Sequence, residues 1–196
     1  MRVFIGESKI GGERGLFVNT SINRGGYICI LPIDYLNISS IWYSLQKDNI
    51  GPVNFRYGIK CDLTIPQSDK NVSVFGTFMN FLSNSKIRNS LKIELSGVSN
   101  SDKLEGDFLG HMINDYVNMS LLNRTSYEKI SNMHENVIVE NTLGLYDGRL
   151  GLRIFAKKDI KSGEELFFSY GVDYWKNYSG LDKFELLPEI HYIELR

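Results

Sequence analysis

The chain has 196 residues, of which 42% are hydrophobic and 23% are charged, and its formal net charge is −1. This length and balance suit one globular domain with a buried core. A net charge so close to zero provides no positive field for nucleic acid, so we expect no nucleic-acid partner. No stretch reaches the about 20 apolar residues of a membrane span, and residues 1–9 lack the long apolar segment of a secretion signal. We therefore expect an intracellular protein, nuclear or cytoplasmic, with no membrane contact.

The two cysteines, Cys29 and Cys61, are too few for a zinc-binding cluster of cysteines. Two reduced thiols are favoured, and one disulfide between them stays open. Glycine is frequent, with 18 residues, whereas proline occurs 4 times, which favours a turn-rich β architecture. His111, His134 and His191 have no metal-ligand spacing, so we interpret them as structural or surface residues and expect no metal site.

The first thirty residues alternate apolar runs with glycine turns. Residues 2–6, 16–18 and 27–31 are predicted strands. The turns between them contain the glycines of residues 11–15 and 23–26. The run at 27–31 is continuous and apolar, which is typical of a buried strand. This pattern predicts a mainly β fold, that is, a β-rich α+β class.

The middle of the chain is less regular. Apolar residues within 38–46 have a helical spacing, which predicts a helix capped by Ser39 or Asn37. The other expected elements are a strand at 55–63, a short helix or strand at 75–82, a strand at 92–95, a surface loop at 96–106, and an insertion or short helix at 119–135.

The clearest strands lie toward the C-terminus. Residues 137–140 predict a strand, and residues 142–148 predict the turn after it. Residues 152–156 and 165–170 predict the two strands of a hairpin, joined by the polar residues 157–163.

Aromatic residues crowd the exit of the last predicted strand, where Tyr170 is followed by a glycine and then by Tyr174 and Trp175. Aromatic side chains beside a glycine turn more often line a site than only stabilise a strand end. Glu164 and Glu165 begin the same strand and point to opposite faces. We therefore interpret them as a turn and strand-start feature, not as a pair of catalytic carboxylates.

Three motifs resemble the SET domain family. Residues 159–171, DIKSGEELFFSYG, are similar to the family's pattern D-I-x-x-G-E-E-L-x-x-x-Y-G. Residues 13–18, ERGLFV, are similar to its opening motif G-x-G-R-G-L-F-A, with Glu13 in place of a glycine. Asn114 and Asp115 resemble the start of its motif N-H-S-x-x-P-N, with Asp115 in place of histidine and without the serine and proline. The second asparagine of that motif stays open among Asn136, Asn118 and Asn132.

The resemblance implies a protein-lysine methyltransferase that uses S-adenosylmethionine. It implies several small β-sheets around a threaded, pseudoknot-like C-terminal segment. Tyr170 is the implied catalytic tyrosine. Trp175 is expected to pack over the adenine, as in compact members, including virus-encoded ones, that lack zinc-binding cysteine clusters. The implied cofactor-binding residues are Glu13, Arg14, Gly15, Asn114, Asp115 and Trp175. The implied lining of the substrate channel is Tyr57, Phe168 and Tyr174.

The simplest division is a single SET-like domain over residues 1–196. Its parts are an N-terminal SET part at 2–31, a variable insert at 32–107, a C-terminal SET part at 108–175 and a C-terminal extension at 176–196. The expected partner is a protein or peptide lysine, with a histone tail among the candidates, and a homodimer stays open. Two alternatives remain: a SET-like module that binds a peptide or partner without catalysis, and a β-rich interaction domain unrelated to the family.

The resemblance also makes a spatial prediction. The glycine bend (residues 11–15), the Asn-Asp corner (Asn114 and Asp115) and the aromatic exit (Phe168, Tyr170, Tyr174 and Trp175) must converge in the folded chain. If these segments lay far apart, the implied site would not exist.

Overall fold

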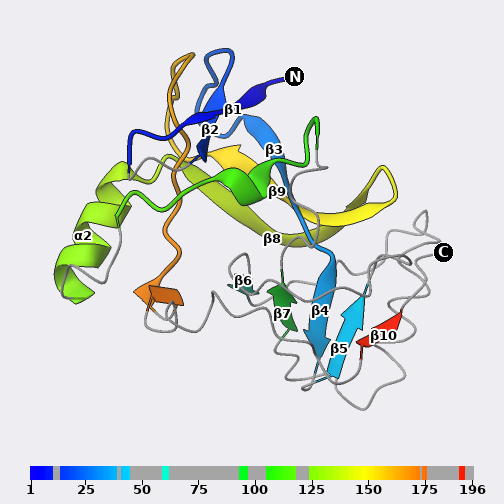
Figure 1. Cartoon of the computed structure of the whole chain (residues 1–196). Helices are drawn as coiled ribbons and strands as arrows, with labels where there is room; N and C mark the ends of the chain where they lie inside the picture. Colours follow the sequence, from blue (N-terminus) through cyan, green and yellow to red (C-terminus); the bar gives the residue numbers. More distant parts are fainter. Residues whose placement is uncertain are drawn as a thin grey trace. The chain divides into compact units, whose positions relative to one another are not determined.

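The computed structural model describes residues 1–10, 14–38, 41–44, 59–61, 93–96, 105–117, 124–172, 174–175 and 190–192 (Figure 1). The chain divides into two compact units. Unit 1 comprises Met1–Leu31, Asp102–Glu140 and Arg153–Asp182, and unit 2 comprises Pro32–Ser101, Asn141–Leu152 and Lys183–Arg196. No helix in the described part of the chain is long and apolar enough to cross a membrane.

Unit 1 begins with a hairpin of two strands. β1 (Val3–Glu7) and β2 (Arg14–Val18) pair antiparallel, with Val3 opposite Val18. Val3, Leu16 and Val18 are fully buried. The two strands predicted in this part of the sequence are therefore confirmed, and they place the end of the glycine bend at the start of β2.

A three-stranded sheet has the order β3-β9-β8, with β9 (Arg149–Ala156) between β3 (Tyr27–Pro32) and β8 (Val137–Tyr146). Residues 28–31 of β3 are all buried, as the continuous apolar run predicted. Leu152 and the neighbouring apolar residues of β9 contribute to the same buried set.

The turn between β8 and β9 is shorter than predicted. It consists of Asp147 and Gly148, with φ values of 48° and 77°. Two successive residues with positive φ form the tight turn whose twist matches a β-hairpin. The predicted turn at 142–148 is therefore wrong in its extent, because β8 continues through Tyr146.

Unit 2 contains a five-stranded sheet with the order β10-β5-β4-β7-β6. Its strands are β4 (Tyr35–Ile38), β5 (Ile41–Ser44), β6 (Ile59–Cys61), β7 (Ile93–Ser96) and β10 (Ile190–Tyr192). Strand β7 confirms the prediction at 92–95. Strand β6 agrees with the predicted strand at 55–63 for the residues that are described. The prediction at 75–82 lies outside the described residues, as do residues 97–104 of the loop predicted at 96–106, whose first residue, Ser96, ends β7.

The helix predicted at 38–46 is wrong, because β4 and β5 occupy its described residues. Ile41, Trp42 and Tyr43 are β-branched or aromatic, and such residues favour strands. β5 pairs antiparallel with β4 and parallel with β10, so other strands supply backbone hydrogen bonds on both of its edges. Over so short a window, apolar spacing does not separate a helix from a buried strand.

Unit 1 contains the short 3₁₀ helix η3 (Gly110–Met112) and the helix α2 (Arg124–His134). Residues 172, 174 and 175 are also helical. Helix α2 confirms the short-helix alternative at 119–135. Its buried residues are Tyr127 and Ser131, one turn apart on the same face.

The hairpin predicted from 152–156 and 165–170 does not form. The first segment lies in β9, between β3 and β8. The second segment bonds to β2 and to the Asn-Asp corner, through the N–H of Leu166 to the oxygen of Leu16 and the N–H of Phe168 to the oxygen of Asn114. In Figure 1 this orange stretch runs past the β1-β2 hairpin. The strand pattern was present, but its partner is distant in sequence, and local periodicity carries no information on that choice.

Candidate functional site

The glycine bend, the Asn-Asp corner and the aromatic exit meet in unit 1. The side-chain amide of Asn114 donates to the carbonyl oxygen of Arg14 at 3.1 Å. The N–H of Phe168 donates to the carbonyl oxygen of Asn114 at 3.1 Å. The hydroxyl of Tyr170 donates to the carbonyl oxygen of Ile113 at 2.8 Å. The corner therefore contacts both other segments, as the sequence predicted for the residues that are described.

Gly15 occupies a position where a side chain has no room. A Cβ atom there would lie 2.2 Å from Oε1 of Glu165 and 3.2 Å from Nδ2 of Asn114. Any other residue here would displace the carboxylate of Glu165, and glycine avoids this displacement. Gly15 thus lets β2, the Asn-Asp corner and the segment of Glu165 come together.

Glu165 belongs to this meeting point, and the sequence interpretation of it as a strand-start feature missed that role. Its side chain is 2% exposed. Oε2 accepts the backbone N–H of Lys9 at 3.1 Å, and Oε1 lies 3.5 Å from the amide nitrogen of Asn114. The available signal was strand alternation, which sends one of two adjacent carboxylates inward. A buried carboxylate must find donors, and here they come from the N-terminal segment and the corner.

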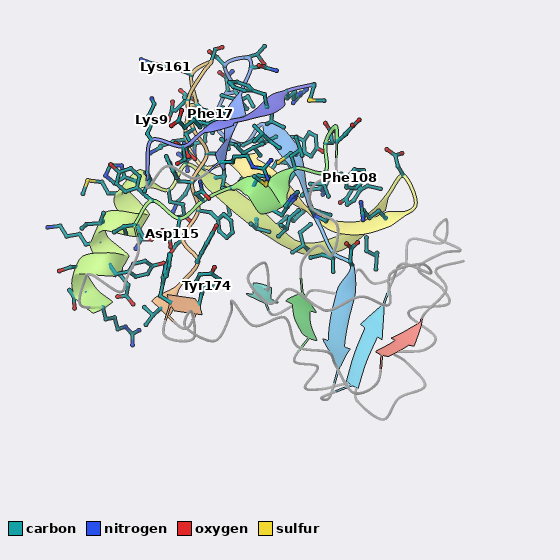
Figure 2. The ribbon with its side chains drawn as sticks, in the orientation of Figure 1. Lys9, Phe17, Phe108, Asp115, Lys161 and Tyr174 are labelled. Carbon is teal, nitrogen blue, oxygen red and sulfur yellow. The ribbon has the colours of Figure 1, made fainter. Side chains whose placement is uncertain are left out.

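Asp115 directs its carboxylate to the other side, toward helix α2 and the aromatic exit (Figure 2). Oδ2 accepts the hydroxyl of Tyr127 at 2.5 Å, the backbone N–H of Tyr170 at 3.0 Å and the indole N–H of Trp175 at 2.9 Å. Oδ1 accepts the hydroxyl of Ser131 at 3.0 Å. One buried carboxylate therefore joins three segments of unit 1.

Tyr127 is fully buried on helix α2, and sequence reasoning did not single it out. Besides donating to Asp115, its hydroxyl accepts the N–H of Gly171 at 2.9 Å and lies 3.1 Å from Oγ of Ser169. Burial raises the pKa of the Tyr127 phenol above its ordinary value, and the hydrogen bond to Asp115 raises it further. The phenol therefore keeps its proton and acts as a donor toward Asp115. The only local signal was the spacing of Tyr127 and Ser131 on one helix face.

The aromatic exit forms a cluster around Tyr170. Its ring centroid lies 5.1 Å from Phe168, 4.6 Å from Tyr174 and 5.9 Å from Trp175, which stacks on it at an interplanar angle of 19°. Tyr174 and Trp175 also contact each other edge to face, with centroids 5.1 Å apart. Phe168 and Tyr170 thus lie together, although residues 168–170 are not part of a strand.

Comparison with known protein families shows to which family the chain belongs. The family model of the SET domain matches residues 13–171 of this 196-residue chain. The chain belongs to the SET domain family. The small β-sheets described above are those of a SET domain fold, whereas the threading of its C-terminal segment stays a prediction.

Solved structures similar to this SET domain include a candidate histone methyltransferase from Plasmodium falciparum. That match has 15% sequence identity and a TM-score of 0.39, and it covers 89% of this chain and 96% of that chain. The Chaetomium thermophilum polycomb repressive complex 2 matches at 16% identity and a TM-score of 0.36, over 86% of this chain and 15% of that chain. ctPRC2 in an autoinhibited conformation bound to S-adenosylmethionine matches at 17% identity and a TM-score of 0.35, with the same coverage.

This SET domain spans about 15% of the length of the polycomb chains it matches. No curated protein matches it.

The side chain of Asn136 forms hydrogen bonds with the backbone of the segment that precedes Tyr170. Its amide nitrogen donates to the carbonyl oxygen of Glu165 at 2.8 Å, and its amide oxygen accepts the N–H of Phe167 at 2.8 Å. Of its rivals for the second asparagine of the motif, Asn132 is exposed on helix α2, and Asn118 lies outside the described residues. Of the three candidates, Asn136 is thus the one that the structure shows bonded to the segment leading to Tyr170.

The remaining predicted site residues, Glu13 and Tyr57, lie outside the described residues. His111 is buried, and His134 stacks on Tyr116 with centroids 3.4 Å apart. Among the described side chains, no group of three His, Cys, Asp or Glu residues is placed to hold a metal ion. Cys29 is a buried free thiol whose pKa is raised by burial.

Proposed function

We propose that this SET domain transfers a methyl group from S-adenosylmethionine to a lysine side chain of a protein. The observation that carries the proposal is the position of Tyr170. Its hydroxyl is bonded to the carbonyl of Ile113, next to the Asn-Asp corner, and its ring is surrounded by the other residues of the aromatic exit. The glycine bend reaches the same corner through Arg14.

The residues of the corner fit S-adenosylmethionine, which carries an ammonium group, a carboxylate and a sulfonium. The carbonyl oxygen of Arg14 provides an acceptor beside Asn114, and acceptors suit positive charge. Gly15 keeps the backbone of β2 close to Asn114. The residues that would hold the cofactor are Glu13, Arg14, Gly15, Asn114, the main chain of Asp115, and Trp175 against the adenine. When bound, the cofactor supplies an electrophilic methyl group.

The aromatic exit favours the neutral form of the lysine amine and orients it. A free lysine amine has a pKa near 10.4, so it must lose a proton before it can attack. The weakly polar surroundings of Phe168, Tyr170 and Tyr174 disfavour the ammonium form, and their π faces still attract positive charge. A phenol oxygen can accept an N–H from the amine while it donates its own proton. The bond to Ile113 fixes the direction of that donation, and fixed positioning lowers the barrier.

A histone tail is the first substrate class to test, and other protein lysines come next. The test is incubation of the protein with radiolabelled S-adenosylmethionine and either histones or a cell lysate, followed by mass spectrometry of the labelled bands. We expect label on lysine. A protein that neither binds S-adenosylmethionine by calorimetry nor labels any substrate would contradict the proposal.

Tyr170→Phe removes the hydroxyl and keeps the ring. We expect turnover to fall roughly 100-fold or more, because a preorganised hydrogen-bonding group at the reacting atoms is lost. The affinity for S-adenosylmethionine should stay within about twofold, since the corner and the stacked rings remain. Tyr116→Phe is the matched control, because Tyr116 stacks on His134 and lies outside the aromatic exit. Near-normal turnover of the Tyr170 variant would refute the assigned role.

A second candidate is a SET-like module that binds a peptide without catalysis. The observation that favours it is Asp115, which replaces the histidine of the motif and whose carboxylate is bonded within the protein. Peptide binding in the absence of both cofactor binding and methyl transfer would select this alternative.

A further inference from the structure

Helix α2 lies between Asn114 and Asn136, which are 136 − 114 = 22 positions apart. The motif N-H-S-x-x-P-N separates its two asparagines by six positions, so helix α2 is additional to the motif if Asn136 is its second asparagine. Its buried residues, Tyr127 and Ser131, both bond to the carboxylate of Asp115, one to each oxygen. The helix is therefore attached directly to the corner.

The carboxylate of Asp115 also binds Tyr170, so it links helix α2 to that residue. The backbone N–H of Tyr170 donates to Asp115, and the hydroxyl at the other end of the same residue donates to Ile113. Both anchoring residues flank Asn114, so Tyr170 is held at its two ends by one short stretch of chain. Tyr127 adds a third restraint, because its hydroxyl accepts the N–H of Gly171.

Trp175 is held by the same oxygen. Its indole N–H donates to Oδ2 of Asp115, and its ring stacks on Tyr170. Oδ2 therefore has three donors, and the hydroxyl of Tyr127 is the shortest of these contacts. A carboxylate that several donors hold has little freedom to rotate, which suits a residue that must set the position of others.

We propose that Asp115, Tyr127 and Ser131 form a positioning device in which helix α2 fixes the Asp115 carboxylate and thereby sets Tyr170 and Trp175 for methyl transfer. The proposal rests on the proposed function. Asp115, Tyr127 and Ser131 are positioning residues in it, because the groups they act through are the catalytic tyrosine and the tryptophan expected at the adenine.

The test compares Tyr127→Phe and Ser131→Ala with the wild type. Tyr127→Phe should lower kcat roughly tenfold or more with little change in KM, because small displacements of reacting groups cost rate more than binding. Ser131→Ala should shift kcat in the same direction by a smaller factor, and it remains informative if the first variant folds poorly. Glu128→Gln is the matched control, since Glu128 pairs with Arg124 on the solvent side of the same helix.

A second readout does not depend on turnover. The indole N–H signal of Trp175 in a ¹H–¹⁵N spectrum, identified by its loss in Trp175→Phe, reports the bond to Asp115. We expect this signal to move and to exchange faster with solvent in Tyr127→Phe, and to stay unchanged in Glu128→Gln.

The outcomes separate the two proposals. A loss of kcat together with a moved indole signal supports the positioning device. An active wild type with unchanged kcat in both α2 variants overturns the device and leaves the proposed function standing. An inactive wild type overturns the proposed function, and the indole signal then decides the device: a shift in Tyr127→Phe supports the link to Trp175, and an unmoved signal overturns it.

Discussion

The two residues of the Asn-Asp corner face different surroundings. Asn114 contacts the carbonyl of Arg14 beside Gly15 and lies next to the carboxylate of Glu165. Asp115 contacts helix α2 and the aromatic exit, where hydroxyl, indole and backbone N–H donors surround its carboxylate. Successive residues of an extended chain face opposite directions, so one dipeptide serves both. The proposed cofactor contacts at Arg14 and Gly15 and the placement of Tyr170 therefore depend on different neighbours, so substitutions can separate these two parts of the site.

The largest expected effect follows from Asp115→Asn, which breaks the side-chain half of the corner. An amide of the same size brings NH₂ donors toward groups that are donors themselves. We expect the free energy of unfolding to fall by about 3 kcal/mol, because bonds to a buried charged acceptor are lost. Urea denaturation followed by circular dichroism measures this, and turnover should fall with it. Glu128→Gln should stay within about 0.5 kcal/mol of the wild type. A loss no larger than that of the control would contradict the role of the carboxylate.

Gly15→Ala disturbs the contacts of Asn114 instead of those of Asp115, and it should have a smaller effect on stability. The new Cβ would overlap with Glu165, and overpacking of this kind costs about 1–3 kcal/mol. Calorimetry should show at least about a tenfold loss of affinity for S-adenosylmethionine, or ~1.4 kcal/mol. Gly106→Ala is the control, because Gly106 has a positive φ of 67° and open space around it. That variant should lose stability through backbone strain while its cofactor affinity stays normal. Equal affinity in Gly15→Ala and the wild type would count against a cofactor site at β2.

The smallest expected effect is a change with pH in the free energy of unfolding, and it depends on the bond between Tyr127 and Asp115. The pKa of Tyr127 is raised in the folded protein, so the native state holds this proton more tightly than the unfolded chain. The resulting stability is complete below the unfolded pKa of about 10 and is lost as the pH rises through the folded value. The difference in unfolding free energy between wild type and Tyr127→Phe should be constant from about pH 7 to 9 and shrink above about pH 10. A difference that stays constant to pH 11 would show that the phenol is not held in this way.

The sequence predicted the half of the site that short motifs encode. Residues 13–18 and Asn114 carry recognisable patterns, and the structure brings Arg14 and Gly15 to Asn114 as expected. The partners of Asp115 were not predictable in this way. Tyr127 lies in a connection without a motif, and its role appears only when helix α2 packs on the aromatic exit.

Prediction of the fold has the same limit, because pairings with partners distant in sequence do not follow from local patterns. Strands such as β3 follow from a continuous apolar run, and this one is confirmed with its burial. The pairing of residues 163–166 with β2, instead of with β9, depends on a partner about 150 residues away in sequence (Leu166 to Leu16). β5 was mistaken for a helix because the strands that complete it, β4 and β10, are also specified by tertiary context.

The most direct test of the account is a calorimetric titration of S-adenosylmethionine into the wild-type protein. If the glycine bend, the Asn-Asp corner and the aromatic exit form one cofactor site, the titration gives saturable binding with a stoichiometry of one per chain. Absence of any binding heat, at protein and ligand concentrations where Tyr170→Phe and the wild type are both folded, would contradict it.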